Sequence, residues 1–209
     1  MAIELDPIRV SRLQNTANQI GDTDSGEAIF AGLYAAGRLR DIKEDPTKWG
    51  SSSRASEGTI IWGTGLMGPQ LLEDVMFGNV DEPFAKTHRL LHEMGHLTMI
   101  QSNEKVVGKA FDLYETLDII RAKNTRILGL SAIASRFYTQ NRAPHEDAAE
   151  LFGMLTHDED RYRAYMRFMK NDSPGMITEK ARHGVATISS SEAQLLDRQL
   201  RSVHEEMLL

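Results

Sequence analysis

Apolar residues recur every three or four positions through most of this chain, which is the spacing of one face of an α-helix. The pattern predicts a protein that is mostly helical. Helices are expected at residues 5–20, 26–44, 105–137, 158–170 and 191–207, with two further helices that begin near Phe84 and near Pro144.

A short strand is predicted at residues 59–62, which are β-branched and aromatic and lie between Gly58 and Gly63. Before this strand, Pro46 and the serine- and glycine-rich run at 50–58 predict a loop. One strand among many helices indicates an α+β fold.

The glycines at 63–68 have the spacing of a phosphate-binding loop, but neither a βαβ unit nor a P-loop lysine accompanies them. A structural turn is therefore the favoured interpretation. The whole chain, 1–209, is expected to form a single domain with an N-terminal helical part at 1–57, a core at 58–170 and a C-terminal helical part at 171–209.

Composition limits the chemistry that is possible. The chain of 209 residues has a formal net charge of −6 and no extended basic patch, which argues against nucleic acid as a partner. Cysteine is absent, so any metal must be held by His, Asp or Glu. We expect a soluble protein without a membrane span or a classical signal peptide, which could still be secreted by a specialised system.

The most informative segment is residues 91–97, Leu-His-Glu-Met-Gly-His-Leu, because it places an HExxH motif within a predicted helix. His92 and His96 are four residues apart, so both imidazoles lie on one helical face and can reach one metal ion. Glu93 could take the proton of a water molecule that attacks a carbonyl. Gly95 indicates that something packs closely against the helix. The alternative is an amphipathic helix whose histidines are ordinary polar residues.

A zinc site needs a third protein ligand. The metzincin pattern would place a histidine where this chain has Ser102, which excludes that subclass. The best remaining candidates are Glu146 and Glu150, which are four residues apart on the helix that begins near Pro144. One of them could bind the metal while the other hydrogen-bonds a ligating histidine. For Glu150, an ordinary position at the edge of the core is an equally good interpretation.

The segment Glu-Asp-Ala-Ala-Glu-Leu-Phe at 146–152, some tens of residues after the HExxH helix, resembles the EFFAExF segment of the anthrax lethal factor family. That family consists of zinc metallopeptidases of the glutamate-zincin class, and the resemblance covers roughly residues 90–165. It implies a zincin-like fold, with a small sheet over the active-site helix, and one zinc ion per chain. The implied ligands are His92, His96 and Glu146, with Glu93 as general base. The ImmA/IrrE-type peptidases offer a second, weaker resemblance.

Three further residues have alternative interpretations. The resemblance implies that Tyr138 could assist at the reacting carbonyl, although a packing role is slightly favoured. His88 lies one turn before His92 and is interpreted as a surface residue or a support for the site, because helix geometry carries it away from the metal. His145 is expected to face substrate or solvent.

These observations predict a zinc-dependent endopeptidase that acts on a protein or peptide substrate. By analogy with the resembled family, it could be a secreted bacterial effector or toxin that acts inside another cell. Two alternatives remain open: a non-catalytic binding or scaffold protein with a structural zinc site, and a peptidase that cleaves peptidoglycan cross-links.

Overall fold

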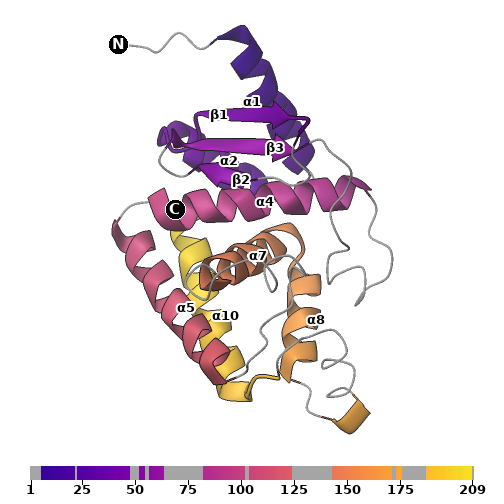
Figure 1. Cartoon of the computed structure of the whole chain (residues 1–209), viewed down its shortest axis with the longest axis vertical. Coiled ribbons are helices and arrows are strands. Elements are labelled where there is room, and N and C mark those ends of the chain that lie inside the picture. Colours follow the sequence, from indigo (N-terminus) through magenta and orange to yellow (C-terminus); the bar gives the residue numbers. More distant parts are fainter. Residues whose placement is uncertain are drawn as a thin grey trace.

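The computed structural model describes residues 6–21, 23–47, 52–54, 57–63, 82–101, 104–123, 143–170, 173–175 and 187–208. Most of these residues are helical (Figure 1). The elements, in chain order, are α1 (Pro7–Ile20), α2 (Asp24–Ala35), β1 (Asp41–Asp45), β2 (Ser52–Arg54), β3 (Thr59–Gly63), α4 (Glu82–Gln101), α5 (Glu104–Lys123), α7 (Ala143–His157), α8 (Glu159–Lys170) and α10 (Ser190–Leu208).

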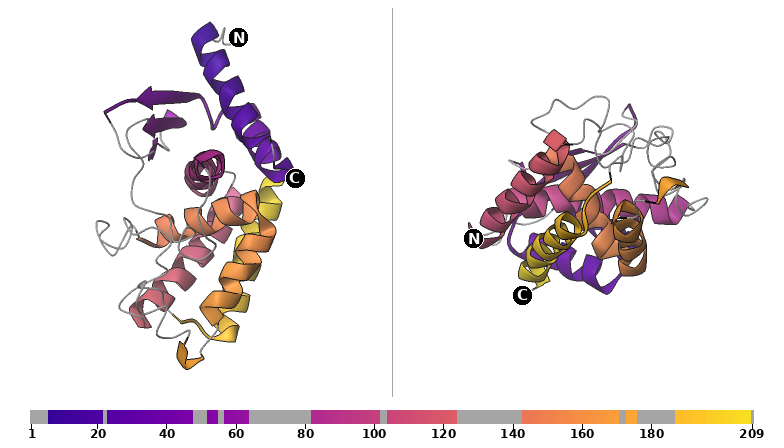
Figure 2. Two further views of the ribbon diagram at one scale, coloured as in Figure 1. Left: turned by 90° about the vertical axis from the view of Figure 1, so that its right-hand side faces the viewer. Right: turned by 90° about the horizontal axis from the view of Figure 1, so that it is seen from below.

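Helix α4 lies between the sheet and the other large helices. Figures 1 and 2 show the three strands on one side of α4, with α5, α7, α8 and α10 on the other side. Its contacts agree with this view, because α4 touches β2 on one side and packs extensively against α7 on the other. The expectation of a mostly helical α+β architecture is confirmed.

The sheet has the strand order β1-β3-β2. Strand β3 runs parallel to β1, with Ile42 opposite Ile60, and antiparallel to β2, with Ser53 opposite Ile60. The strand predicted at 59–62 is therefore confirmed as the central strand of the sheet. Strand β2 is an edge strand among those described, and it lies nearest to α4 (Figure 1).

Two predictions about the N-terminal region are wrong. The helix predicted at 26–44 ends at Ala35, because Gly37 adopts a left-handed conformation with φ of +67°. Residues 41–45 instead form strand β1. The predicted loop at 50–58 contains strand β2, whose pairing with β3 overrides a local sequence typical of loops.

Gly58 packs against the short segment that joins α2 to β1. It has φ of +63°, and a Cβ atom there would lie 2.3 Å from the carbonyl oxygen of Arg38. The backbone nitrogen of Arg40 donates a hydrogen bond to the Gly58 carbonyl at 2.7 Å. Because glycine has no side chain, the backbone before β3 can lie in direct contact with the backbone before β1.

The remaining predicted helices are confirmed where the structure describes them. Asp6 caps α1 by accepting a hydrogen bond from the backbone nitrogen of Ile8, and Asp158 caps α8 in the same way through Asp160 and Arg161. The predicted helix 105–137 corresponds to α5 up to Lys123. Its remainder, and the glycine turn after Gly63, lie outside the described residues.

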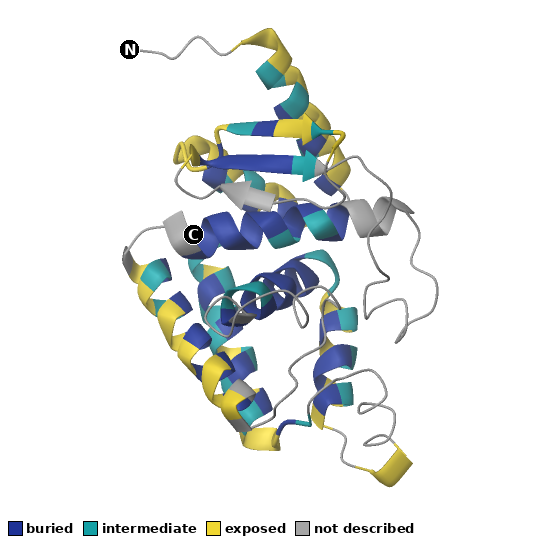
Figure 3. Cartoon of the chain, viewed as in Figure 1, coloured by how far each residue is buried: buried dark blue, intermediate teal, exposed yellow. Residues whose placement is uncertain are grey.

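Nearly all the side chains whose burial is described on helix α4 are buried. From Thr87 to Met99 every residue is buried except Arg89 and His92, which are half-buried (Figure 3). Such a helix is normally apolar on all sides, yet this one buries His88, Glu93 and His96. Buried polar groups cost free energy unless they are paired, so the partners of these side chains identify the candidate site. None of the helices in the described ranges combines the length and the apolarity that a membrane span requires.

Candidate metal centre

Small residues let α4 and α7 approach each other closely. A Cβ atom on Gly95 would lie 3.3 Å from the Cα of Ala149 and 3.1 Å from Phe152. On the facing helix, a Cβ atom on Gly153 would lie 3.1 Å from the backbone nitrogen of His92. Larger side chains at these positions would push the helices apart. The close packing expected at Gly95 is confirmed, and it is what brings the polar groups of α4 and α7 within reach of each other.

The structure brings together the three residues that the sequence suggested as metal ligands. The Nε2 atoms of His92 and His96 are 3.2 Å apart. Each of them lies 3.3 Å from Oε2 of Glu146. Within the described part of the chain, these three residues are the one group of His, Cys, Asp and Glu donors with the spacing of a metal site.

Glu150 pairs with His92 through the ring nitrogen that does not face the candidate metal site. Its Oε2 lies 2.7 Å from Nδ1 of His92, and its Oε1 lies 2.9 Å from Nε2 of His88. A carboxylate only accepts hydrogen bonds, so the imidazole nitrogen of His92 must be the donor. With its proton on Nδ1, a neutral His92 directs the lone pair of Nε2 towards His96 and Glu146. This is the state that metal coordination requires.

The electrostatics of the cluster reflect this pairing. Burial alone would lower the pKa of the His92 imidazole, but its hydrogen bonds to Glu146 and Glu150 raise that pKa well above the ordinary value. Burial would raise the pKa of the Glu146 carboxyl, yet His92 and His96 hold it far below its usual range. For Glu150, His88 and His92 outweigh burial in the same way. The two carboxylates are therefore ionised and attract positive charge.

The geometry fits a zinc ion. Zinc binds imidazole nitrogen and carboxylate oxygen at about 2.0–2.1 Å, so in a tetrahedral site its donor atoms are about 3.3 Å apart. The three separations in the cluster are 3.2, 3.3 and 3.3 Å. Two imidazole nitrogens and one carboxylate oxygen also form a donor set typical of catalytic zinc, which keeps its fourth position for water or substrate.

Glu93 lies beside the candidate ligands but belongs to a different face of α4. It is 4% exposed. Arg89, one turn earlier, interacts electrostatically with Glu93, and its guanidinium carbon lies 5.6 Å from the ring centre of Trp62 on β3. This face of α4 is therefore turned towards the sheet. Glu93 also interacts electrostatically with His92, so its carboxylate lies near the metal-binding face as well.

The other predicted site residues have different outcomes. Tyr138 lies outside the described residues, so its role stays a prediction. His145 is half-buried and packs against Tyr114 of α5, with ring centres 4.0 Å apart, rather than facing only solvent. Burial and the nearby His96 lower its pKa. His88 does not join the three donors, as expected, but it is 1% exposed and is therefore not a surface residue.

Two contributions were missed in the sequence. The first is the bond between His88 and Glu150, which the spacing of three histidines at 88, 92 and 96 could have indicated. The second is Gly153, which contacts the backbone of His92 from α7. A glycine two turns after Glu146 on the same helix was the available signal.

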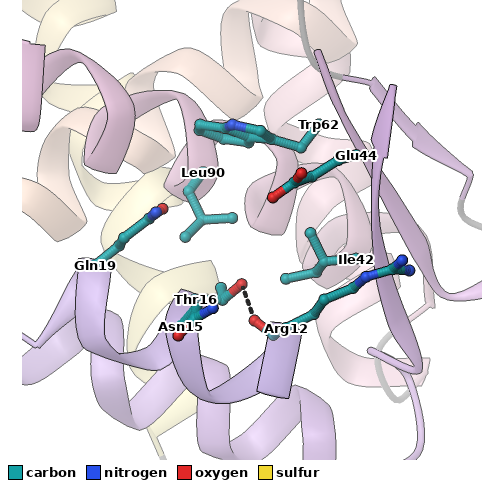
Figure 4. Close-up of a pocket in the computed structure, with 8 residues that line it drawn as sticks. All are labelled: Arg12, Asn15, Thr16, Gln19, Ile42, Glu44, Trp62 and Leu90. Atoms are coloured by element: carbon teal, nitrogen blue, oxygen red, sulfur yellow. Dashed lines mark hydrogen bonds between the residues drawn. The ribbon is translucent and has the colours of Figure 1, made fainter. Parts of the chain in front are cut away.

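A pocket elsewhere in the molecule does not belong to the metal centre. It lies where α1, the sheet and α4 meet, and Leu90 forms its wall on α4 (Figure 4). Residues two apart on a helix point in nearly opposite directions, so Leu90 faces away from His92. Other residues around it are Arg12, Asn15, Ile42, Glu44 and Trp62.

Comparisons with protein-family models, with curated proteins and with solved structures gave no match to this chain. The functional argument therefore rests on the chemistry of the cluster itself.

Proposed function

We propose that this protein is a zinc-dependent endopeptidase with a zincin-like arrangement of its catalytic residues, which hydrolyses an internal peptide bond of a protein substrate. One observation carries the proposal: Nε2 of His92, Nε2 of His96 and Oε2 of Glu146 form a triangle with sides of 3.2–3.3 Å. Three electron-rich atoms at this separation repel one another unless a cation or a proton lies between them. A zinc ion supplies that charge.

The chain's own residues supply the rest of the chemistry. When bound, zinc polarises a substrate carbonyl and acidifies water. Glu93 takes a proton from the attacking water and delivers it to the leaving amine nitrogen. Its burial at 4% exposure keeps bulk water from competing for that proton. Glu150 keeps His92 in the tautomer that leaves its Nε2 available for zinc.

The position of the sheet supports an extended peptide as substrate. Among the described strands, β2 is an edge strand in contact with α4, the helix that carries Glu93. A peptide that adds to this edge gains main-chain hydrogen bonds and passes along the face of α4 that bears the general base. Side chains of the peptide would then determine specificity. The assignment as a secreted bacterial effector or toxin stays a prediction that rests on the family resemblance.

The decisive experiment is Glu93→Gln, because Glu93 binds no metal and its removal separates catalysis from zinc binding. The zinc-loaded wild type and the variant are incubated with a cell lysate, and new protein termini are identified by mass spectrometry. We expect specific new termini with the wild type and a decrease of about 10²–10⁴-fold in their rate of formation with the variant. Both proteins should contain one zinc ion by elemental analysis.

The matched control is Glu115→Gln, which removes an exposed glutamate from α5 and should cleave like the wild type. Absence of zinc from the wild type would refute the metal centre. Zinc with identical termini for wild type and Glu93→Gln would instead favour a structural zinc site in a binding or scaffold protein. A parallel digest of cell walls tests peptidoglycan, since release of muropeptides without new protein termini would change the substrate class.

A further inference from the structure

We propose that His88 is a positioning residue, which fixes the Glu150 carboxylate so that Glu150 in turn orients His92 for metal binding. This inference rests on the proposed function, because it assigns His88 a task in the same metal centre. His88 lies outside the HExxH motif, and it is not one of the three residues whose donor atoms form the candidate metal site. Its effect would pass through two hydrogen bonds.

The cluster is built as a ladder between two antiparallel helices. Along α4, His88, His92 and His96 follow one another at intervals of one turn, and along α7 so do Glu146 and Glu150. Each glutamate bridges two successive histidines. Glu150 pairs with His88 and His92 at 2.9 and 2.7 Å, whereas Glu146 pairs with His92 and His96 at 3.3 Å each.

The two bridges differ in which atoms they use. At Glu146 a single oxygen, Oε2, faces both imidazoles, which leaves three donors around one point and forms a metal site. At Glu150 the oxygens are used separately: Oε1 takes His88 and Oε2 takes His92. Each oxygen of Glu150 thus has its own histidine partner, and the two hydrogen bonds together fix the orientation of the carboxylate.

His92 is the member that both bridges share. Its Nδ1 faces Glu150 and its Nε2 faces Glu146, so the orientation of its ring depends on where the Glu150 carboxylate lies. Both Glu150 and His88 are deeply buried, at 4% and 1% exposure, where water cannot replace a lost hydrogen bond. Without the bond from His88, one oxygen of a buried carboxylate loses its donor. The carboxylate can then rotate away from His92 to recover one.

Two amide substitutions test this role with little change in polarity. In His88→Gln the side-chain amide nitrogen can reach the place of imidazole Nε2 and still donate to Oε1 of Glu150. In His88→Asn the side chain is one methylene shorter and cannot reach it. The two variants therefore differ in the proposed hydrogen bond, and His204→Gln, a substitution of a half-buried histidine that packs on Phe152 of α7, serves as the control.

Three quantities are measured on the full chain: zinc affinity by competition with a chelator, peptidase kcat/KM, and the Nδ1 proton resonance of His92 by NMR. We expect His88→Asn to bind zinc about 10–100-fold more weakly, which is the usual cost of removing a partner of a ligating histidine. Its His92 Nδ1 proton should be lost to exchange. His88→Gln and His204→Gln should stay within about threefold of the wild type, well below that cost.

The outcomes separate the two proposals. If His88→Asn retains the wild-type zinc affinity and the His92 Nδ1 proton, the positioning role is wrong, while cleavage by the wild type would leave the proposed function intact. If the wild type binds no zinc, the proposed function is wrong, and the Nδ1 proton in the metal-free variants still decides whether His88 orients His92. Equal losses in both His88 variants would show that the imidazole's shape, not its hydrogen bond, is required, and would also overturn the inference.

Discussion

Two pairs of packed helices in this molecule differ in what they bury. Helices α5 and α10 pack on each other, and most of their buried residues are apolar and spaced by three and four along each helix, among them Val106, Ala110, Leu113, Leu117 and Ile120 on α5 and Ala193, Leu196, Leu200 and Val203 on α10. Charged groups stay at the margin, as in the ion pair of Lys109 with Glu206 at 2.6 Å. Where α4 meets α7, histidines and glutamates are buried beside glycine and alanine.

The difference predicts that apolar interfaces mainly provide stability and that the interface of α4 with α7, under the proposed function, provides chemistry. Apolar burial between α5 and α10 contributes directly to the free energy of unfolding. Burying His88 and Glu150, and partly burying His92 and Glu146, contributes little net stability and restricts how α4 and α7 can pack, because each polar group requires its partner. A fold retains such an interface when the polar groups have a use. Substitutions in the two interfaces should therefore produce different phenotypes.

The largest effect is expected from Glu146→Ala. This substitution removes one of the three donor atoms. Loss of a hydrogen-bond partner of a ligand lowers zinc affinity by up to about 100-fold, and loss of a ligand itself should lower it further. Elemental analysis and chelator competition measure this loss. A variant that retains zinc at wild-type affinity would exclude Glu146 as a ligand.

A comparable loss in a different quantity is expected from Leu200→Ala. This residue is completely buried on α10, and its truncation should lower the free energy of unfolding by about 2–5 kcal/mol. Zinc affinity of the folded protein should not change, since Leu200 lies on α10, which carries none of the candidate ligands. Urea unfolding beside zinc titration tests the separation, which a parallel fall in affinity would contradict.

A smaller effect is expected at the helix contact itself, from a pair of glycine substitutions. Gly108→Ala on α5 meets no atom within 4 Å and should stabilise the protein by about 1 kcal/mol through helix propensity. Gly153→Ala places its methyl group 3.1 Å from the His92 backbone, and overpacking should make it about 1–3 kcal/mol less stable than Gly108→Ala. Thermal unfolding of the two variants measures the difference. Equal stabilisation by both would mean that α4 and α7 can separate at no cost.

The smallest effect is expected in the pH dependence of the metal-free protein. Glu146 and Glu150 have pKa values far below the ordinary 4.5, so their contribution is present above pH 4.5 and is lost as the pH falls through the folded-state values. His92 has a pKa raised above 6.5, so its contribution is present below pH 6.5 and is lost as the pH rises through the folded-state value. Stability from the cluster should therefore be greatest between about pH 4.5 and 6.5.

Urea unfolding between about pH 4 and pH 8, on both sides of this maximum, measures the effect, with Leu200→Ala as a control whose pH profile should run parallel to the wild type. Zinc competes with the proton on His92, so zinc affinity should rise with pH over the same range. A wild-type profile that is flat between pH 4 and 8 would argue against the paired arrangement of Glu150 and His92.

How much the sequence reveals depends on whether the pattern is local. The α5 and α10 faces follow from apolar residues at helical spacing, which any window of ten residues displays. Strand β1 could not be predicted, because Asp-Ile-Lys-Glu-Asp at 41–45 has little strand character and is extended only through pairing with β3, some eighteen residues later. Similarly, β2 depends on its partner strand.

The same distinction applies to the candidate site. His92, Glu93 and His96 follow from a five-residue motif, and the spacing of Glu146 and Glu150 on a second helix suggested a shared task. Which glutamate faces which histidine depends on the register between α4 and α7, and that register is set by Gly95 and Gly153 at the contact. The bond between His88 and Glu150 follows from the register and not from either helix alone.

Because the candidate ligands come from both α4 and α7, the metal binding proposed above would link metal supply to folding. His92 and Glu146 are separated by more than fifty positions in the chain, so an ion held between them binds the folded protein and has no equivalent site in an unfolded one. Each tenfold increase in free zinc above the dissociation constant then adds about 1.4 kcal/mol to the free energy of unfolding. The free energy of unfolding would then depend on the concentration of free zinc. The protein would be more stable where zinc is plentiful and less stable where a chelator or a zinc-poor compartment lowers its concentration.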